Sequence, residues 1–93
     1  SIYWVYILSS KLNGTLYVGV TSNLVAAFTN KQKLLKGFSQ KYNIDKLVYA
    51  EQFNDIHEAI AREKCLKKWK RAWKVRLIEQ DTSTWADLYE KIL

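Results

Sequence analysis

The sequence contains no proline, three glycines and one cysteine in 93 residues. Because proline and glycine are so scarce, nothing in the composition indicates a disordered tail or a linker between domains. The one cysteine, Cys65, cannot form an internal disulfide, which is typical of a reducing compartment. No apolar run reaches the roughly 18 residues of a membrane-spanning helix, and no signal peptide pattern is present. We therefore expect a single cytoplasmic domain, residues 1–93, that is neither secreted nor membrane-spanning.

The basic residues are concentrated in one part of the chain. The formal net charge is +6, and more than half of the 15 Lys and Arg residues fall between positions 62 and 76. They are Arg62, Lys64, Lys67, Lys68, Lys70, Arg71, Lys74 and Arg76. The only acid among them is Glu63. Such a segment favours an anionic partner, either nucleic acid or an acidic membrane surface, over a face that is merely solvated.

Three segments have the composition of β-strands. Ile2 to Leu8 is apolar or aromatic without a break, which predicts a strand covered on both faces. Turn chemistry at Asn13-Gly14 separates it from a second strand, Thr15 to Val20, so the two should form an antiparallel hairpin. Leu47 to Phe53 is predicted as a third strand that runs antiparallel to the hairpin.

The hairpin is expected to bring two tyrosines onto one face of the sheet. Side chains alternate between the faces along a strand, so the register decides which residues lie side by side. A two-residue turn at Asn13-Gly14, and any shift of that register by an even number of residues, places Tyr6 and Tyr17 on the same face. A shift by an odd number would separate them.

The remaining segments are predicted to be helical. Thr21-Ser22-Asn23 is an N-cap cluster, and Trp73 and Leu77 are expected to pack a later helix onto the core. The four expected helices are Leu24 to Leu35, Asp55 to Trp69, Arg71 to about Gln80, and Trp85 to Leu93. The order ββαβααα gives an α+β fold, in which helices flank both faces of a three-stranded antiparallel sheet.

One carboxylate lies on the apolar stripe of the basic helix. The residues that recur there at helical spacing are Ile56, Ala59, Ile60, Leu66 and Trp69. Glu63 is four residues from Ala59 and three from Leu66, so its side chain points with the apolar face. A carboxylate there is costly unless a hydrogen-bond donor, a basic partner or a metal ion satisfies it. Glu63 is therefore either ion-paired at the edge of the stripe, or metal-binding or catalytic.

Two short motifs in the hairpin, Trp4-Val5-Tyr6 and Tyr17-Val18-Gly19, begin a longer resemblance. They are similar to the two elements that name the GIY-YIG nuclease superfamily. The likeness is nearest to its small single-domain bacterial branch. It runs in order and spacing through YVGVTSNL (Tyr17 to Leu24), KGFSQKYN (Lys36 to Asn43), LVYAEQF (Leu47 to Phe53), AIAREKCLKKWKRAWK (Ala59 to Lys74) and WADLYE (Trp85 to Glu90).

The resemblance implies hydrolysis of a DNA phosphodiester with one divalent cation, Mg²⁺ or Mn²⁺. The family's metal ligand is a single Glu on the long helix, and Glu63 occupies that position. The tyrosines of the two motifs map to Tyr6 and Tyr17, one of which would activate the attacking water directly or through the metal. Gly19 matches the Gly that closes the second motif, where the missing Cβ lets other backbone or a ligand approach the strand.

The first helix departs from the family pattern. The resemblance predicts an Arg there that stabilises charge on the phosphate, followed about one turn later by a His or Tyr. Ala26 and Ala27 occupy the arginine positions of this chain, and Asn30 lies nearest the second position. Loss of one positioned charge at a phosphoryl transition state commonly costs roughly 10²–10⁵ in rate.

These observations lead to three functional hypotheses. The first is a metal-dependent GIY-YIG endonuclease that acts in DNA repair or recombination on branched, damaged or single-stranded DNA, with no membrane partner. The DNA-binding residues would be Lys64, Lys67, Lys68, Lys70, Arg71 and Lys74. The second is a catalytically silent nucleic-acid-binding module, because Ala26 and Ala27 replace the arginines. The third is a protein-interaction adaptor that uses exposed aromatic residues.

Overall fold

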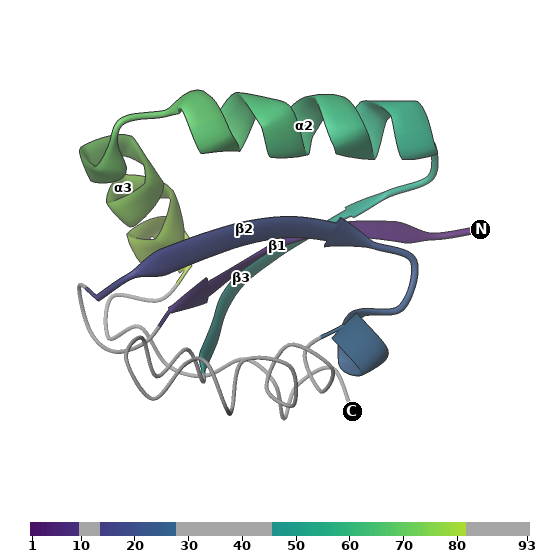
Figure 1. Cartoon of the computed structure of the whole chain (residues 1–93), viewed down its shortest axis with the longest axis horizontal. Helices are drawn as coiled ribbons and strands as arrows, with labels where there is room; N and C mark the ends of the chain where they lie inside the picture. Colours follow the sequence, from purple (N-terminus) through teal and green to yellow (C-terminus); the bar gives the residue numbers. More distant parts are fainter. Residues whose placement is uncertain (10–13, 28–45, 82–93) are drawn as a thin grey trace.

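The computed structural model of the chain describes residues 1–9, 14–27 and 46–81. These ranges hold β1 (Tyr3–Ser9), β2 (Leu16–Thr21), β3 (Lys46–Phe53), α2 (Ile56–Lys68) and α3 (Arg71–Asp81) (Figure 1). The strands form one antiparallel sheet of order β2-β1-β3. The predicted α+β fold with a three-stranded antiparallel sheet is therefore confirmed. No helix in the described ranges is long and apolar enough to cross a membrane.

Several predictions from the sequence lie outside the described residues. They concern the first helix beyond residue 27, including Asn30, and the last helix, Trp85 to Leu93. The loop Lys36 to Asn43 also lies outside these ranges. These segments stay predictions.

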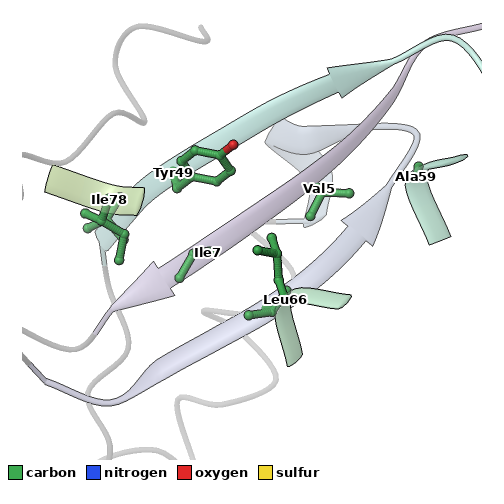
Figure 2. Close-up of a cluster of buried hydrophobic side chains, with 8 residues drawn as sticks. Val5, Ile7, Tyr49, Ala59, Leu66 and Ile78 are labelled. Carbon is green, nitrogen blue, oxygen red and sulfur yellow. The ribbon is translucent and has the colours of Figure 1, made fainter. Parts of the chain in front are cut away.

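The central strand β1 is buried on both faces, as its unbroken apolar sequence predicts. Val5 and Ile7 pack on one side against Leu66 of α2 and Ile78 of α3 (Figure 2). On the other side Tyr6 and Leu8 belong to a second cluster. That cluster contains Leu24, from a helical turn at residues 24–27. Helices therefore cover both faces of the sheet, with α2 and α3 on one face and this turn on the other.

Two side chains cap the helices as their sequence positions predict. The Asp55 carboxylate accepts a hydrogen bond of 3.1 Å from the backbone N–H of His57 at the start of α2. The Asn23 side-chain oxygen accepts one of 3.0 Å from the N–H of Ala26. Each bond satisfies a donor that has no partner inside its own helix.

The prediction that Trp73 packs into the core is wrong. Its side chain is 48% exposed, and its ring meets that of Trp69 edge-on, with the centroids 6.0 Å apart. The helix α3 reaches the core through Ile78, which is fully buried. The apolar residues of α3 are spread around the helix instead of forming one stripe, so their spacing alone did not identify the buried face.

The ring of Tyr6 lies across Gly19 of the neighbouring strand. The two residues are directly paired in the β1–β2 ladder. A Cβ at position 19 would lie 2.5 Å from Cζ of Tyr6 and closer still to its hydroxyl oxygen. The feature that approaches this glycine is thus a side chain of the neighbouring strand, and not the backbone or ligand expected from the sequence.

We expect Gly19→Ala to destabilise the fold by about 1–3 kcal/mol, the usual range for overpacking a filled site. Denaturant unfolding of Gly19→Ala, Tyr6→Ala and the double variant measures the free energy of unfolding of each. Because Tyr6→Ala removes the ring that the new methyl group would meet, adding Gly19→Ala to it should cost little. Strictly additive losses would contradict the proposed contact.

Candidate active site

Tyr6 and Tyr17 lie on one face of the sheet, as the register analysis predicts. Tyr6 pairs with Gly19, and Tyr17 pairs with Leu8, which makes the tyrosines diagonal neighbours on adjacent strands. Their ring centroids are 6.5 Å apart, with the ring planes tilted by 33°. Because β2 is an edge strand of the described sheet and the Tyr6 ring crosses Gly19, the Tyr6 phenol extends toward that edge.

Glu63 reaches the same region from α2. This helix packs on the other face of the sheet and lies over β1 and β2 (Figure 1). The Glu63 side chain is only 14% exposed, and its Oε2 lies 2.8 Å from Nζ of Lys67. The charge of Glu63 acts on the ionisation of Tyr6, so carboxylate and phenol share one electrostatic environment. We call these three residues, Tyr6, Tyr17 and Glu63, the carboxylate–tyrosine cluster.

Burial raises the pKa of Tyr6 to about 12, and the negative charges of Tyr17 and Glu63 act in the same direction. The Tyr6 phenol is therefore protonated at neutral pH and can donate a hydrogen bond. It can act as a base only if a cation nearby offsets these effects.

Lys67 is the counter-ion of Glu63 in this structure. Its hydrogen bond to Glu63 raises the pKa of Lys67, and the negative charges of Glu63 and Tyr17 add to this effect. The place of Lys67 in the basic segment also predicts that it binds phosphate. The spacing of four residues between an acid and a following lysine on one helix is the sequence signal that identifies this pair.

Arg62, the neighbour of Glu63, points toward β3, at the opposite edge of the described sheet from β2. Its Nε donates a hydrogen bond of 3.1 Å to Oε1 of Glu51 on β3, and the Tyr49 hydroxyl donates one of 2.9 Å to the same oxygen. Burial and the bond to Glu51 raise the pKa of Tyr49 to about 12. This group holds α2 against β3, and it separates Arg62 from the rest of the basic segment.

The six basic residues that the sequence predicts to bind DNA lie on α2, on α3 and between them. Those that are exposed are Lys64, Lys67, Lys68, Lys70 and Arg71, and Lys74 is half-buried. Nζ of Lys70 lies 6.0 Å from the centroid of the Trp73 ring. Because Lys64 and Lys68 are exposed, they present their charges on the outer side of α2, the helix that carries Glu63.

Two further residues differ in their surroundings. His57 is 89% exposed on its side chain and lies 3.5 Å from the Asp55 carboxylate, so it is a surface residue. Cys65 is also exposed. It follows Lys64 on the outer side of α2, where packing does not cover it.

Position 27 lies on the face of the sheet that carries the tyrosines. Ala27 packs against the buried cluster that contains Tyr6 and Leu24, and Tyr17 borders the same cluster. The absence of an arginine at position 27 therefore removes a positive charge from the tyrosine side of the sheet.

The donors of the carboxylate–tyrosine cluster are all oxygen atoms. Among the described residues, no group of three or more His, Cys, Asp or Glu side chains could hold a metal ion. A site here would have one carboxylate, from Glu63, with phenol oxygens nearby. Such a set suits a hard cation that keeps most of its water ligands, as Mg²⁺ does.

Alkaline titration tests the environment of Tyr6. Because its pKa is near 12 in the fold and near 10 when unfolded, folding stability should fall as pH rises from about 10 to 12. In Tyr6→Phe this fall should be smaller by about 2 kcal/mol at pH 12. Phenolate absorbance and denaturant unfolding across this pH range provide the measurement. Identical curves for both proteins would show that Tyr6 is not shielded.

Comparison with known proteins agrees with this arrangement. A family model described as the GIY-YIG catalytic domain matches residues 2–76. A UPF0213 protein of Staphylococcus haemolyticus (strain JCSC1435) is 34% identical over 82 residues, which cover 84% of this chain and 95% of that protein. No solved structure matches the chain significantly. Because the family model covers most of the chain and this relative is similar over most of its length, the chain belongs to the GIY-YIG nuclease superfamily, whose substrates are nucleic acids.

Proposed function

We propose that the protein is a metal-dependent endonuclease that hydrolyses phosphodiester bonds in DNA. The observation that carries this proposal is Glu63, a carboxylate that is 14% exposed and whose charge acts on the Tyr6 phenol, on a helix with a basic outer surface. A largely buried carboxylate that influences a neighbouring phenol is typical of functional sites. Family membership supplies the reaction class, and the residues of this chain supply the groups for it.

Glu63 would hold the cation, Mg²⁺ or Mn²⁺. When bound, such an ion supplies a Lewis acid for a phosphate oxygen and favours ionisation of water. In this structure Lys67 forms an ion pair with the Glu63 carboxylate. The Lys67 side chain is 55% exposed and flexible. The ammonium group can therefore move from Glu63 to a DNA phosphate without breaking a packed contact.

The two tyrosines would position the water and the phosphate. Tyr6 is protonated at neutral pH, so it would donate its proton in a hydrogen bond to a phosphate oxygen. Tyr17, at the β2 edge and half-buried, would orient the attacking water. Lys64 and Lys68 lie outside the carboxylate–tyrosine cluster and would bind phosphates along the DNA strand.

We propose branched, damaged or single-stranded DNA as the substrate, in preference to a defined duplex sequence. In the described part of the chain, the surface beside Glu63 carries lysines on α2. Lysines contact phosphates, which carry no sequence information directly. Roles in repair or recombination are compatible with such a substrate.

A second candidate function is DNA binding without cleavage. It is favoured by Ala26 and Ala27, which stand where the family has arginine, and by the position of Ala27 on the tyrosine face of the sheet. Under this alternative the basic surface is retained, and the transition state lacks one stabilising charge.

Glu63→Gln should reduce Mg²⁺-dependent cutting of branched or single-stranded DNA at least about 100-fold, because an amide holds a divalent cation far more weakly. The fold should change little, since an ion pair of this kind contributes roughly 0–1 kcal/mol. Glu58→Gln is the matched control, because Glu58 is exposed on the first turn of the same helix. Unchanged cutting by Glu63→Gln would assign the activity to other residues.

DNA affinity should fall steeply with salt, because phosphate contacts release counterions. Lys64→Ala and Lys68→Ala should each lower the slope of log K against log salt by about 1. Arg62→Met should leave the slope unchanged, because the Arg62 guanidinium is hydrogen-bonded to Glu51. Titrations at several salt concentrations measure these slopes. Equal effects from Arg62→Met and the lysine variants would contradict the assignment of the basic surface.

A further inference from the structure

We propose that a hollow between the end of α2 and α3 binds one unpaired base of a single-stranded nucleic acid. The hollow has a volume of about 200 Å³ and is lined by Trp69, Trp73, Arg76, Leu77 and Gln80. The inference rests on the proposed function in that its ligand is a nucleic acid. It adds a specific contact, base stacking, that the carboxylate–tyrosine cluster does not provide.

The two tryptophan rings that line the hollow contact other side chains of the fold. The Arg62 guanidinium lies 5.1 Å from the centroid of the Trp69 ring, and Glu51 fixes that guanidinium in turn. Trp73 stands against Trp69 at an interplanar angle of 84°. Two rings at right angles offer a face and an adjacent wall to a flat ligand. Because Trp69 is already ordered, binding loses little side-chain entropy there.

The size of the hollow matches a single ring system. Pockets that enclose drug-sized ligands measure about 300–1,000 Å³, which is larger than this one. Stacking of a base on an aromatic side chain needs only a flat surface, and it tolerates any base. The Gln80 amide at the rim has both donors and acceptors for the edge of a base.

The charge around the hollow favours a polyanion. Arg76 is part of the lining and Lys70 lies beside the Trp73 ring, and no acidic residue is among the lining residues that the structure describes. A stable protein partner would need about 1,000 Å² of interface. In the described ranges Ile2 is the other large exposed apolar residue, and it is next to the N-terminus, which lies at the opposite end of the molecule from α3 (Figure 1). A single exposed tryptophan that is flanked by cations fits a base better.

The hollow and the carboxylate–tyrosine cluster are close enough to contact one strand. Trp69 follows Glu63 by six residues, which corresponds to a rise of about 9 Å along a helix. The exposed Lys70 follows Trp69 directly. A strand whose phosphate lies at Glu63 would pass around the end of α2, by way of Lys70, to place an unpaired base in the hollow.

The test compares two DNA strands of equal length and charge, an oligothymidine and the same strand with abasic sites, in EDTA so that no cutting occurs. Trp73→Ala should weaken binding of the oligothymidine about 5- to 150-fold, the range for one stacked base. It should leave the abasic strand and the salt slope unaffected, because tryptophan carries no charge. Trp73→Phe should keep most of the affinity. Ile2→Ala, which removes the other large exposed apolar side chain, is the control.

A second pair of variants keeps the test independent of the tryptophan. Gln80→Glu should weaken binding of the oligothymidine more than Gln52→Glu, which makes the same charge change at an exposed position of β3. Equal affinities of Trp73→Ala and the unmodified protein would overturn the inference. So would a change from dimer to monomer on Trp73→Ala in sedimentation, which would make this face an interface between copies. Cutting of duplex DNA together with no binding of single strands would overturn the inference and leave the proposed nuclease intact.

Discussion

The phenol of Tyr6 can extend toward the edge of the sheet only because residue 19 has no side chain. Tyr6 lies on the central strand β1, and its ring passes over Gly19 of β2. This places the hydroxyl near Tyr17 and within the field of Glu63, although Glu63 comes from a helix on the other face of the sheet. A side chain at position 19 would block this path. The proposed chemistry thus depends on one pair of neighbouring residues across two strands.

Two adjacent residues of α2, Arg62 and Glu63, contact different parts of the structure. Glu63 points toward the tyrosines and pairs with Lys67. Arg62 points toward β3, where Glu51 accepts its hydrogen bond. Because consecutive side chains of a helix project about 100° apart, one helix can anchor itself to the sheet and present a carboxylate at its edge. The anchor also orients Trp69, so the fold, the candidate active site and the aromatic hollow are connected through α2.

The sequence predicted the features that depend on local patterns. The unbroken apolar run of β1 predicted the two-sided core, and the parity of the register predicted the shared face of Tyr6 and Tyr17. Features that depend on how α2 crosses the sheet could not be predicted. Glu51 and Arg62 are eleven residues apart and meet only through the tertiary fold. The exposure of Trp73 likewise depends on which side of α3 meets the core, and its apolar residues occupy several sides. Residue spacing predicted that Glu63 lies on the apolar face of the helix, but it was not used to predict that Lys67 is its ion-pair partner.

We propose that the carboxylate–tyrosine cluster cuts DNA even though Ala27 stands where the family has arginine. Single-turnover cleavage of branched and single-stranded DNA with Mg²⁺ or Mn²⁺ tests it directly, using the unmodified protein and Ala27→Arg. Ala27 packs against the cluster that contains Tyr6, so a guanidinium there would start from the tyrosine face of the sheet. We predict slow cutting by the unmodified protein and cutting at least about 10-fold faster by Ala27→Arg. Binding by both proteins without cutting by either would contradict the claim.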